Sequence, residues 1–146
     1  MGSSDDSGTH TAAKAKDAIA IGTATVTSAE GATAIGKKAA ASGDSSIALG
    51  SNTQATKGSS LAIGNTTTAT GVSAAALGPN SNAVKDYDVA LGSSVNASGS
   101  GSAAVGYLVN TTGNQAFGAG SNTTVSGPAA VGIGYKSEAT GNRAVA

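Results

Sequence analysis

The chain has 146 residues, and its eight Lys and Arg balance eight Asp and Glu, so the formal net charge at pH 7 is zero. Only 11% of the residues are charged, and no basic patch points to nucleic acid or an anionic membrane as a partner. There is no cysteine, which excludes disulfides and thiolate chemistry. The length suits one domain, or a piece of one, without a membrane-spanning run of apolar residues.

The first ten residues, MGSSDDSGTH, are polar and carry no periodic pattern. We interpret residues 1–10 as a disordered leader or as residues left from an expression vector. From about Thr11 onward a repeat can be followed, and it continues to the last residue. We therefore treat residues 11–146 as one repetitive domain, which we expect to be a fragment of a longer chain because it stops within a repeat.

A glycine recurs at a fixed spacing of 14 residues, and a fixed period is the signature of a repeat architecture. The members of this column are Gly22, Gly36, Gly50, Gly64, Gly78, Gly92, Gly106, Gly120 and Gly134. Before most of these glycines stands an apolar–Ala–apolar triplet such as Ile47-Ala48-Leu49. This alternation has a period of two and predicts a strand, and a second alternation after the glycine predicts another.

Fourteen residues at about 3.3 Å each give about 46 Å of chain, which is enough for two short strands and two tight turns. We therefore predict an all-β, flattened two-sheet β-solenoid, whose coils stack in parallel at a spacing of about 4.8 Å. The glycines mark the turns, where they allow a positive φ or the close approach of stacked turns. Each coil alone is too small to be stable, so neighbouring coils must stabilise one another.

The side chains of each triplet alternate between the interior and the exterior of the solenoid. We place the larger apolar residues inside and the alanine between them outside. A solvated strand face would carry Thr, Lys or Glu, so an outward ladder of alanine suggests a face that is covered by copies of the same chain. The predicted subunit contacts are Ala48, Ala62, Ala76, Ala90 and Ala104.

Two sets of residues are candidates for contact with a ligand. One is the outward face of the second strand of each coil, with Asn82, Asn96 and Asn110. The other is a pair of tyrosines, Tyr107 and Tyr135, which share a column two coils apart. Exposed tyrosines often anchor partners, although packing over a turn or at a subunit interface is an open alternative for both of them.

No constellation in the sequence points to catalysis, a metal or a cofactor. The one histidine, His10, has no partner pattern, and no Gly-x-Ser-x-Gly elbow with a histidine is present. The bend at residues 85–88, Lys-Asp-Tyr-Asp, could hold a cation, but an ordinary solvated turn is favoured. We therefore predict that the protein is not an enzyme.

The repeat units resemble those of a known family. The segments 43–55 (GDSSIALGSNTQA) and 58–64 (GSSLAIG) are similar to the head repeats of YadA-like trimeric autotransporter adhesins, and the similarity covers residues 17–146. It implies a left-handed parallel β-roll and a homotrimer on the surface of a Gram-negative bacterium, projecting from the outer membrane. It also implies that the membrane anchor lies in a further C-terminal domain. The handedness comes from the resemblance alone, because general chirality rules favour right-handed crossovers.

The resemblance implies an adhesin head that attaches the bacterium to a host extracellular-matrix protein or cell-surface receptor, and no short motif marks which one. A rigid spacer within a surface fibre is the alternative. An ice-binding solenoid is less favoured, because the outward Thr ladder is interrupted by residues such as Asn82 and Val84. A solenoid acyltransferase would need 18-residue coils and a catalytic histidine, and neither is present.

Overall fold

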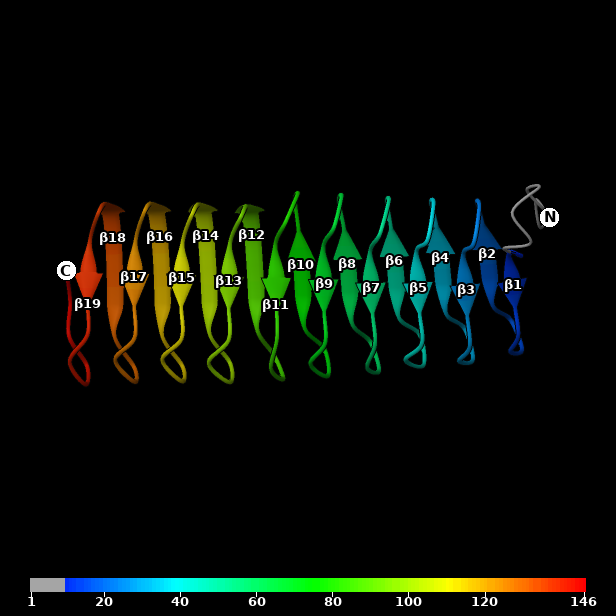
Figure 1. The fold of residues 1–146 in the computed structure, drawn as a ribbon. Coiled ribbons are helices and arrows are strands. Elements are labelled where there is room, and N and C mark those ends of the chain that lie inside the picture. Colours follow the sequence, from blue (N-terminus) through cyan, green and yellow to red (C-terminus); the bar gives the residue numbers. More distant parts are fainter. Residues whose placement is uncertain (1–9) are drawn as a thin grey trace.

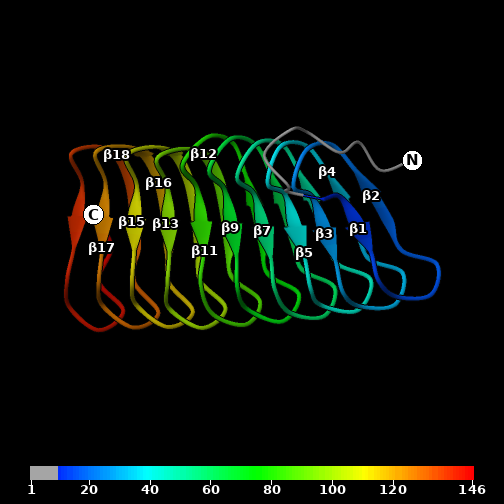
Figure 2. The same cartoon turned by 45° about the vertical axis from the view of Figure 1, so that its right-hand side comes forward.

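The computed structural model describes residues 10–146, so the disordered or vector-derived leader predicted at residues 1–10 lies outside that range except for His10. The described chain forms a rod in which strands of two sheets alternate along the sequence (Figure 1). Each coil contributes one strand to each sheet, and the coils follow one another from end to end (Figure 2). No residue of this range is helical, so the all-β parallel solenoid is confirmed.

The nine-stranded sheet, here called the main sheet, contains the strands built on the triplets before the glycine column, and its last four strands include the glycine. These are β2 (Ile19–Ile21), β4 (Thr33–Ile35), β6 (Ile47–Leu49), β8 (Leu61–Ile63), β10 (Ala75–Leu77), β12 (Val89–Ser93), β14 (Ala103–Tyr107), β16 (Phe117–Ser121) and β18 (Val131–Tyr135).

The ten-stranded sheet, here called the short-strand sheet, is built from strands of two residues. These are β1 (Ala12–Ala13), β3 (Val26–Thr27), β5 (Ala40–Ala41), β7 (Gln54–Ala55), β9 (Thr68–Ala69), β11 (Asn82–Ala83), β13 (Asn96–Ala97), β15 (Asn110–Thr111), β17 (Thr124–Val125) and β19 (Glu138–Ala139).

The register between coils is constant, and each strand residue pairs in parallel with the residue 14 positions later. In the main sheet Ala76 pairs with Ala90, and in the short-strand sheet Asn82 pairs with Asn96. The backbone hydrogen bonds therefore run from coil to coil along the rod, as between the N–H of Ile47 and the carbonyl of Ser60 at 2.9 Å. A change of register would displace every side chain of a coil, so the sequence period and the structural period must agree.

The interior between the two sheets is filled by small side chains, and this corrects one sequence-based prediction. The column of Ala48, Ala62, Ala76, Ala90 and Ala104, which we expected to face outward, is completely buried within the single chain. The larger residues of the triplets face outward instead. The alternation was right, but its phase was wrong, because the space between the sheets holds no fully buried side chain larger than valine.

The glycine column lies where each main-sheet strand ends or, in β12, β14, β16 and β18, one residue before its end. All nine glycines have φ between 110° and 145°, a region that side chains rarely adopt. Space is also restricted, since a Cβ on Gly50 would overlap the carbonyl group of Gly64 in the next coil. Glycine is therefore required there both by its backbone conformation and by the close approach of stacked turns.

A second conformational period of seven residues divides each coil into two halves. Every seventh residue from Asp17 to Arg143 is in the left-handed region, with φ between 51° and 68°. Seventeen of these residues are not glycine. Their N–H groups bond to the preceding coil, as from Asn52 to the carbonyl of Lys37 at 2.8 Å. The inter-coil hydrogen bonds thus hold a conformation that most residues disfavour by about 1 kcal/mol or more.

Interior volume is balanced between the two sheets near the C-terminal end. Val125 lies in a column of the short-strand sheet where the coils on either side have Thr111 and Ala139. On the main sheet opposite, Gly132 stands where most coils have alanine. A Cβ on Gly132 would lie 2.7 Å from Cγ2 of Val125, so the larger side chain of one sheet occupies the volume that the other sheet leaves.

The glycine column can be tested with Gly50→Ala. We expect a loss of about 2–3 kcal/mol of stability per chain, because the substitution combines a strained φ with a backbone overlap. Thermal unfolding measures the loss. The control is Gly58→Ala, where φ is ordinary and the nearest atom to the new Cβ, the Asp44 carbonyl oxygen, lies 3.9 Å away. Equal melting temperatures for the two variants would contradict this explanation.

The interior balance can be tested with a double-mutant cycle. Gly132→Ala should destabilise the protein by about 1–3 kcal/mol through overpacking. Val125→Ala should remove the clash, so the double variant should be at least about 1 kcal/mol more stable than the sum of the single changes predicts. Combining Gly132→Ala with Val95→Ala, more than two coils away, should give simple additivity. Additive effects in both cycles would show that Val125 and Gly132 do not compete for the same volume.

Candidate functional site

The outward side of the main sheet is an apolar face that extends along the rod. Its exposed fractions are large for apolar residues, with 47% for Ile21, 45% for Leu91 and 59% for Ile133. The face consists of Ile19, Ile21, Ile35, Ile47, Leu49, Leu61, Ile63, Leu77, Val89, Leu91, Val105, Phe117, Val131 and Ile133. A continuous apolar surface of this kind marks a site of contact with another molecule.

The outward side of the short-strand sheet is polar and holds the predicted asparagine ladder. Asn82, Asn96 and Asn110 are adjacent in register, one on each of three successive coils. The Nδ2 group of Asn96 donates hydrogen bonds to Oδ1 of Asn110 at 2.8 Å and to Oγ of Ser98 at 3.3 Å. The amides of Asn96 and Asn110 thus align each other, and this face offers a partner both donors and acceptors.

The two predicted tyrosines lie on the main sheet and not on the sheet of the asparagines. Tyr107 ends β14 and Tyr135 ends β18, and both pair in register with Ser121 of the strand between them. Tyr107 is 52% exposed and Tyr135 is 70% exposed. Since the chain turns directly from Tyr107 into Asn110, the two sets of predicted contacts adjoin at one long edge of the rod.

The bend at residues 85–88 owes its shape to two carboxylates. Asp88 is completely buried, and its Oδ1 accepts hydrogen bonds from the N–H and the hydroxyl of Ser102 at 2.8 and 2.9 Å. Its Oδ2 accepts a hydrogen bond from the N–H of Lys85 at 2.8 Å. Asp86 accepts one from the N–H of Val72 at 2.8 Å. Both acids therefore link neighbouring segments of backbone, which assigns this bend a role in stacking.

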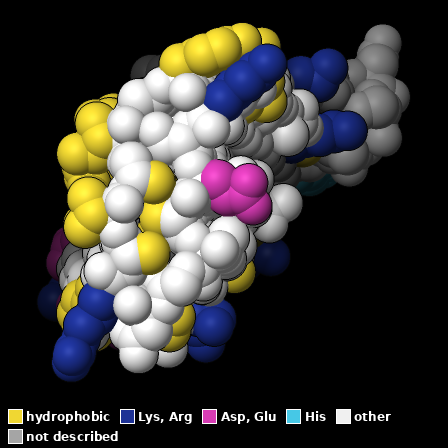
Figure 3. Space-filling view, turned by 90° about the vertical axis from the view of Figure 1, so that its left-hand side faces the viewer, with side chains coloured by type: hydrophobic (Ala, Val, Ile, Leu, Met, Phe, Trp, Pro, Cys, Tyr) yellow, Lys and Arg dark blue, Asp and Glu magenta, His cyan; other side chains and the backbone are white. Residues whose placement is uncertain are grey.

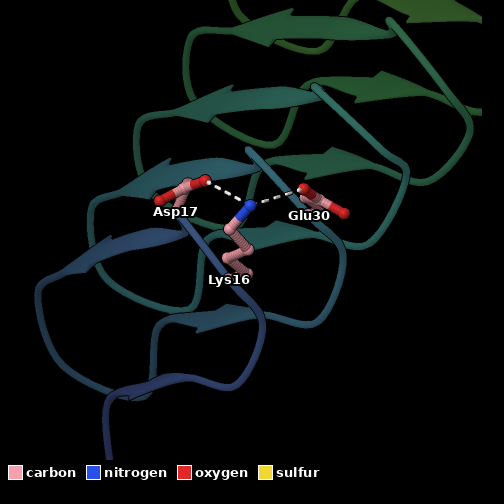
Figure 4. Close-up of polar contacts among 3 residues, drawn as sticks. All are labelled: Lys16, Asp17 and Glu30. Carbon is pink, nitrogen blue, oxygen red and sulfur yellow. Dashed lines mark ion pairs between the residues drawn. The ribbon is translucent and has the colours of Figure 1, made fainter.

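Charge is distributed unevenly along the rod. Near the N-terminal end, Nζ of Lys16 lies 3.7 Å from Asp17 and 3.6 Å from Glu30, an exposed cluster (Figure 4). By contrast, residues 89–135 contain no Lys, Arg, Asp, Glu or His. A view onto the end of the rod that carries the C-terminus shows hydrophobic patches along its outline, with Lys and Arg side chains near its upper and lower edges (Figure 3).

Within residues 10–146, no group of three or more His, Cys, Asp and Glu is placed to hold a metal ion. The same residues form no helix that is long and apolar enough to span a membrane.

Comparison with models of protein families shows which family the chain belongs to. A model of the YadA head domain repeat (2 copies) matches residues 13–39, 41–67, 69–94 and 126–146. The chain belongs to the YadA head domain repeat family. This confirms the resemblance that the 14-residue glycine period and the apolar–Ala–apolar triplets had indicated.

Among solved structures, the collagen-binding domain of the Yersinia adhesin YadA is similar to this chain. The TM-score is 0.58 and the sequence identity is 22%. The alignment covers 82% of this chain and 66% of that domain. The two therefore share a fold over most of this chain. None of the curated proteins compared with the chain matches it.

Sequence reasoning missed the apolar face, although its signal was present. The triplets contain Ile, Leu and Val at two positions and alanine at the third, and the narrow interior admits only the alanine. The alanines predicted as subunit contacts therefore lie on the interior side of these strands.

Proposed function

We propose that this YadA head domain attaches a bacterium to host cells or extracellular matrix from the outer surface of the cell. Membership of the head-repeat family carries the proposal, since that family is one of adhesins. The rod supports it physically, because a stack of equivalent coils presents long surfaces with repeated side chains and few charges.

The similar Yersinia domain is described as collagen-binding. A matrix protein is therefore the first class of ligand to test for this chain. The polar face with its asparagine ladder and the tyrosines at the adjoining edge are the surfaces that we assign to ligand contact. The amides of Asn82, Asn96 and Asn110 can bond to a polar partner without the desolvation of a charge.

We also propose that the chain is a homotrimer whose subunits meet through the apolar face of the main sheet. In a single chain this face leaves residues such as Ile21, Leu91 and Ile133 about half exposed. Burial of apolar surface contributes about 25 cal/mol per Å², and the face extends over all nine strands of the sheet. The apolar face replaces the buried alanine column as the candidate subunit contact. The number of three subunits rests on the resemblance to trimeric autotransporter adhesins.

The assembly is tested by sedimentation of Leu91→Glu. The side chain is 45% exposed in one chain, so a glutamate there is tolerated by the fold but would be buried without a partner in the trimer. We expect the trimer to dissociate. Asn96→Glu places the same charge on the polar face of a nearby coil and should leave the trimer intact. A trimer that survives Leu91→Glu and Ile47→Glu would exclude the apolar face as the subunit contact.

Adhesion is tested with protein-coated beads on matrix proteins and host cells, with soluble protein as competitor. Replacing Asn82, Asn96 and Asn110 together by lysine should weaken attachment at least tenfold, since each defect is repeated in three chains and on many heads. Like charges in register lower stability somewhat, so the melting temperature is compared with that of a control that carries the same charges. The matched control puts three lysines at Val26, Ala40 and Gln54, in the same column of the N-terminal coils.

Unchanged attachment of the asparagine variant would move the contact surface elsewhere on the rod. A wild-type head that attaches to no matrix protein and no cell type would support the alternative, that the domain is a rigid spacer of a surface fibre.

A further inference from the structure

One edge of the rod carries an arrangement that neither the stacking nor the apolar face requires. Tyr107, Ser121 and Tyr135 stand in one parallel ladder, and we call this set the tyrosine ladder. Successive coils are about 4.8 Å apart, so the two tyrosines are separated by about 10 Å along the rod. Only the small side chain of Ser121 occupies the position between two exposed phenol rings.

Hydrogen-bonding groups accompany the rings at the same turn. The residue after Ser121 is Asn122, an exposed residue with φ of 54°, and its Nδ2 group lies 3.3 Å from Oγ of Ser121. A serine hydroxyl thus stands in register between two tyrosines, with an asparagine amide beside it. Binding sites for small polar molecules combine aromatic surfaces with a few fixed polar groups in this way.

The charge pattern restricts the chemistry of a partner at this ladder. Tyr107 and Ser121 lie within residues 89–135, which are free of charged side chains. The one adjacent cation, Lys136, places Nζ 5.2 Å from the centre of the Tyr135 ring and so is already engaged with it. The cores of interfaces are depleted in charged residues and enriched in tyrosine, so the ladder favours an uncharged partner with hydroxyl or amide groups.

We propose that the tyrosine ladder binds a neutral sugar residue of a host glycan. A pyranose ring has one face of C–H groups, whose partial positive charge suits the negative face of an aromatic ring. Its hydroxyl groups suit the Ser121 hydroxyl and the Asn122 amide. A protein partner would need about 800 Å² on its side of a stable interface, whereas the ladder consists of two rings and two small polar groups.

This inference rests on the proposed adhesin function, and it narrows the ligand from a host macromolecule to the sugar that the macromolecule carries. A site of this size binds weakly in a single chain. Three copies in a trimer, and many trimers on one cell, raise the effective strength of attachment to a glycan-rich surface without any new contact.

The test measures binding of the assembled protein to polymers that carry glucose, galactose, mannose or N-acetylglucosamine, with a sialylated polymer as the charged comparison. We expect binding to at least one neutral polymer. Tyr107→Ala and Tyr135→Ala should each reduce it at least fivefold, while Tyr107→Phe, which keeps the ring, should retain most of it. The matched control is Tyr87→Ala, which removes a tyrosine that is 66% exposed at the opposite turn.

Sedimentation of the same variants checks the alternative role of the tyrosines. A trimer that dissociates on Tyr107→Ala would identify the ring as a subunit contact and overturn the proposal. Binding to no neutral polymer, or equal binding by all variants, would overturn it as well.

Enzymatic removal of glycans from host cells separates this proposal from the adhesin function. Attachment that is lost with the glycans supports the sugar site. Attachment that persists unchanged would contradict the sugar site but would agree with the adhesin function, with a protein as the ligand. A wild-type protein that attaches neither to untreated cells nor to cells without glycans would contradict both the sugar site and the adhesin function.

Discussion

The narrow space between the two sheets is the constraint on which the rest of this structure depends. Within residues 10–146, every fully buried side chain is valine, threonine, alanine, serine or Asp88. Such an interior contributes little apolar burial per residue, so each coil relies on its neighbours for hydrogen bonds and packing. It also forces isoleucine, leucine and phenylalanine to the outside, where they form a face that only another molecule can cover.

Much of the fold followed from spacing alone. The glycine period from Gly22 to Gly134 fixed the coil length, and the alternation in triplets such as Leu61-Ala62-Ile63 fixed the strands. Periodicity assigns residues to two faces but does not say which face is interior. Conventional reasoning places the larger apolar side chains inside, and the choice was wrong here because the sheet separation, which decides it, is not encoded in the period.

The left-handed residues at every seventh position were beyond sequence reasoning for another reason. Their column contains Ser59, Thr66, Leu108 and Gln115 alongside the asparagines that such a conformation favours. The column holds no single conserved residue type, because the inter-coil hydrogen bonds hold the backbone whatever the side chain is. The site residues show the same limit, since the sequence singled out Tyr107 and Asn110 but could not place them at one edge on adjoining sheets.

The direction of the ladder hydrogen bonds gives the rod an unusual response to force. They lie parallel to the long axis, as between Ser59 N–H and the Asp44 carbonyl of the preceding coil, so tension along the rod pulls them apart one coil at a time. A folded coil spans about 4.8 Å of the axis, but its 14 residues extend to about 46 Å. Each coil that opens would therefore span roughly ten times its folded length along the axis. Under shear flow, the rod would extend in steps, one coil at a time.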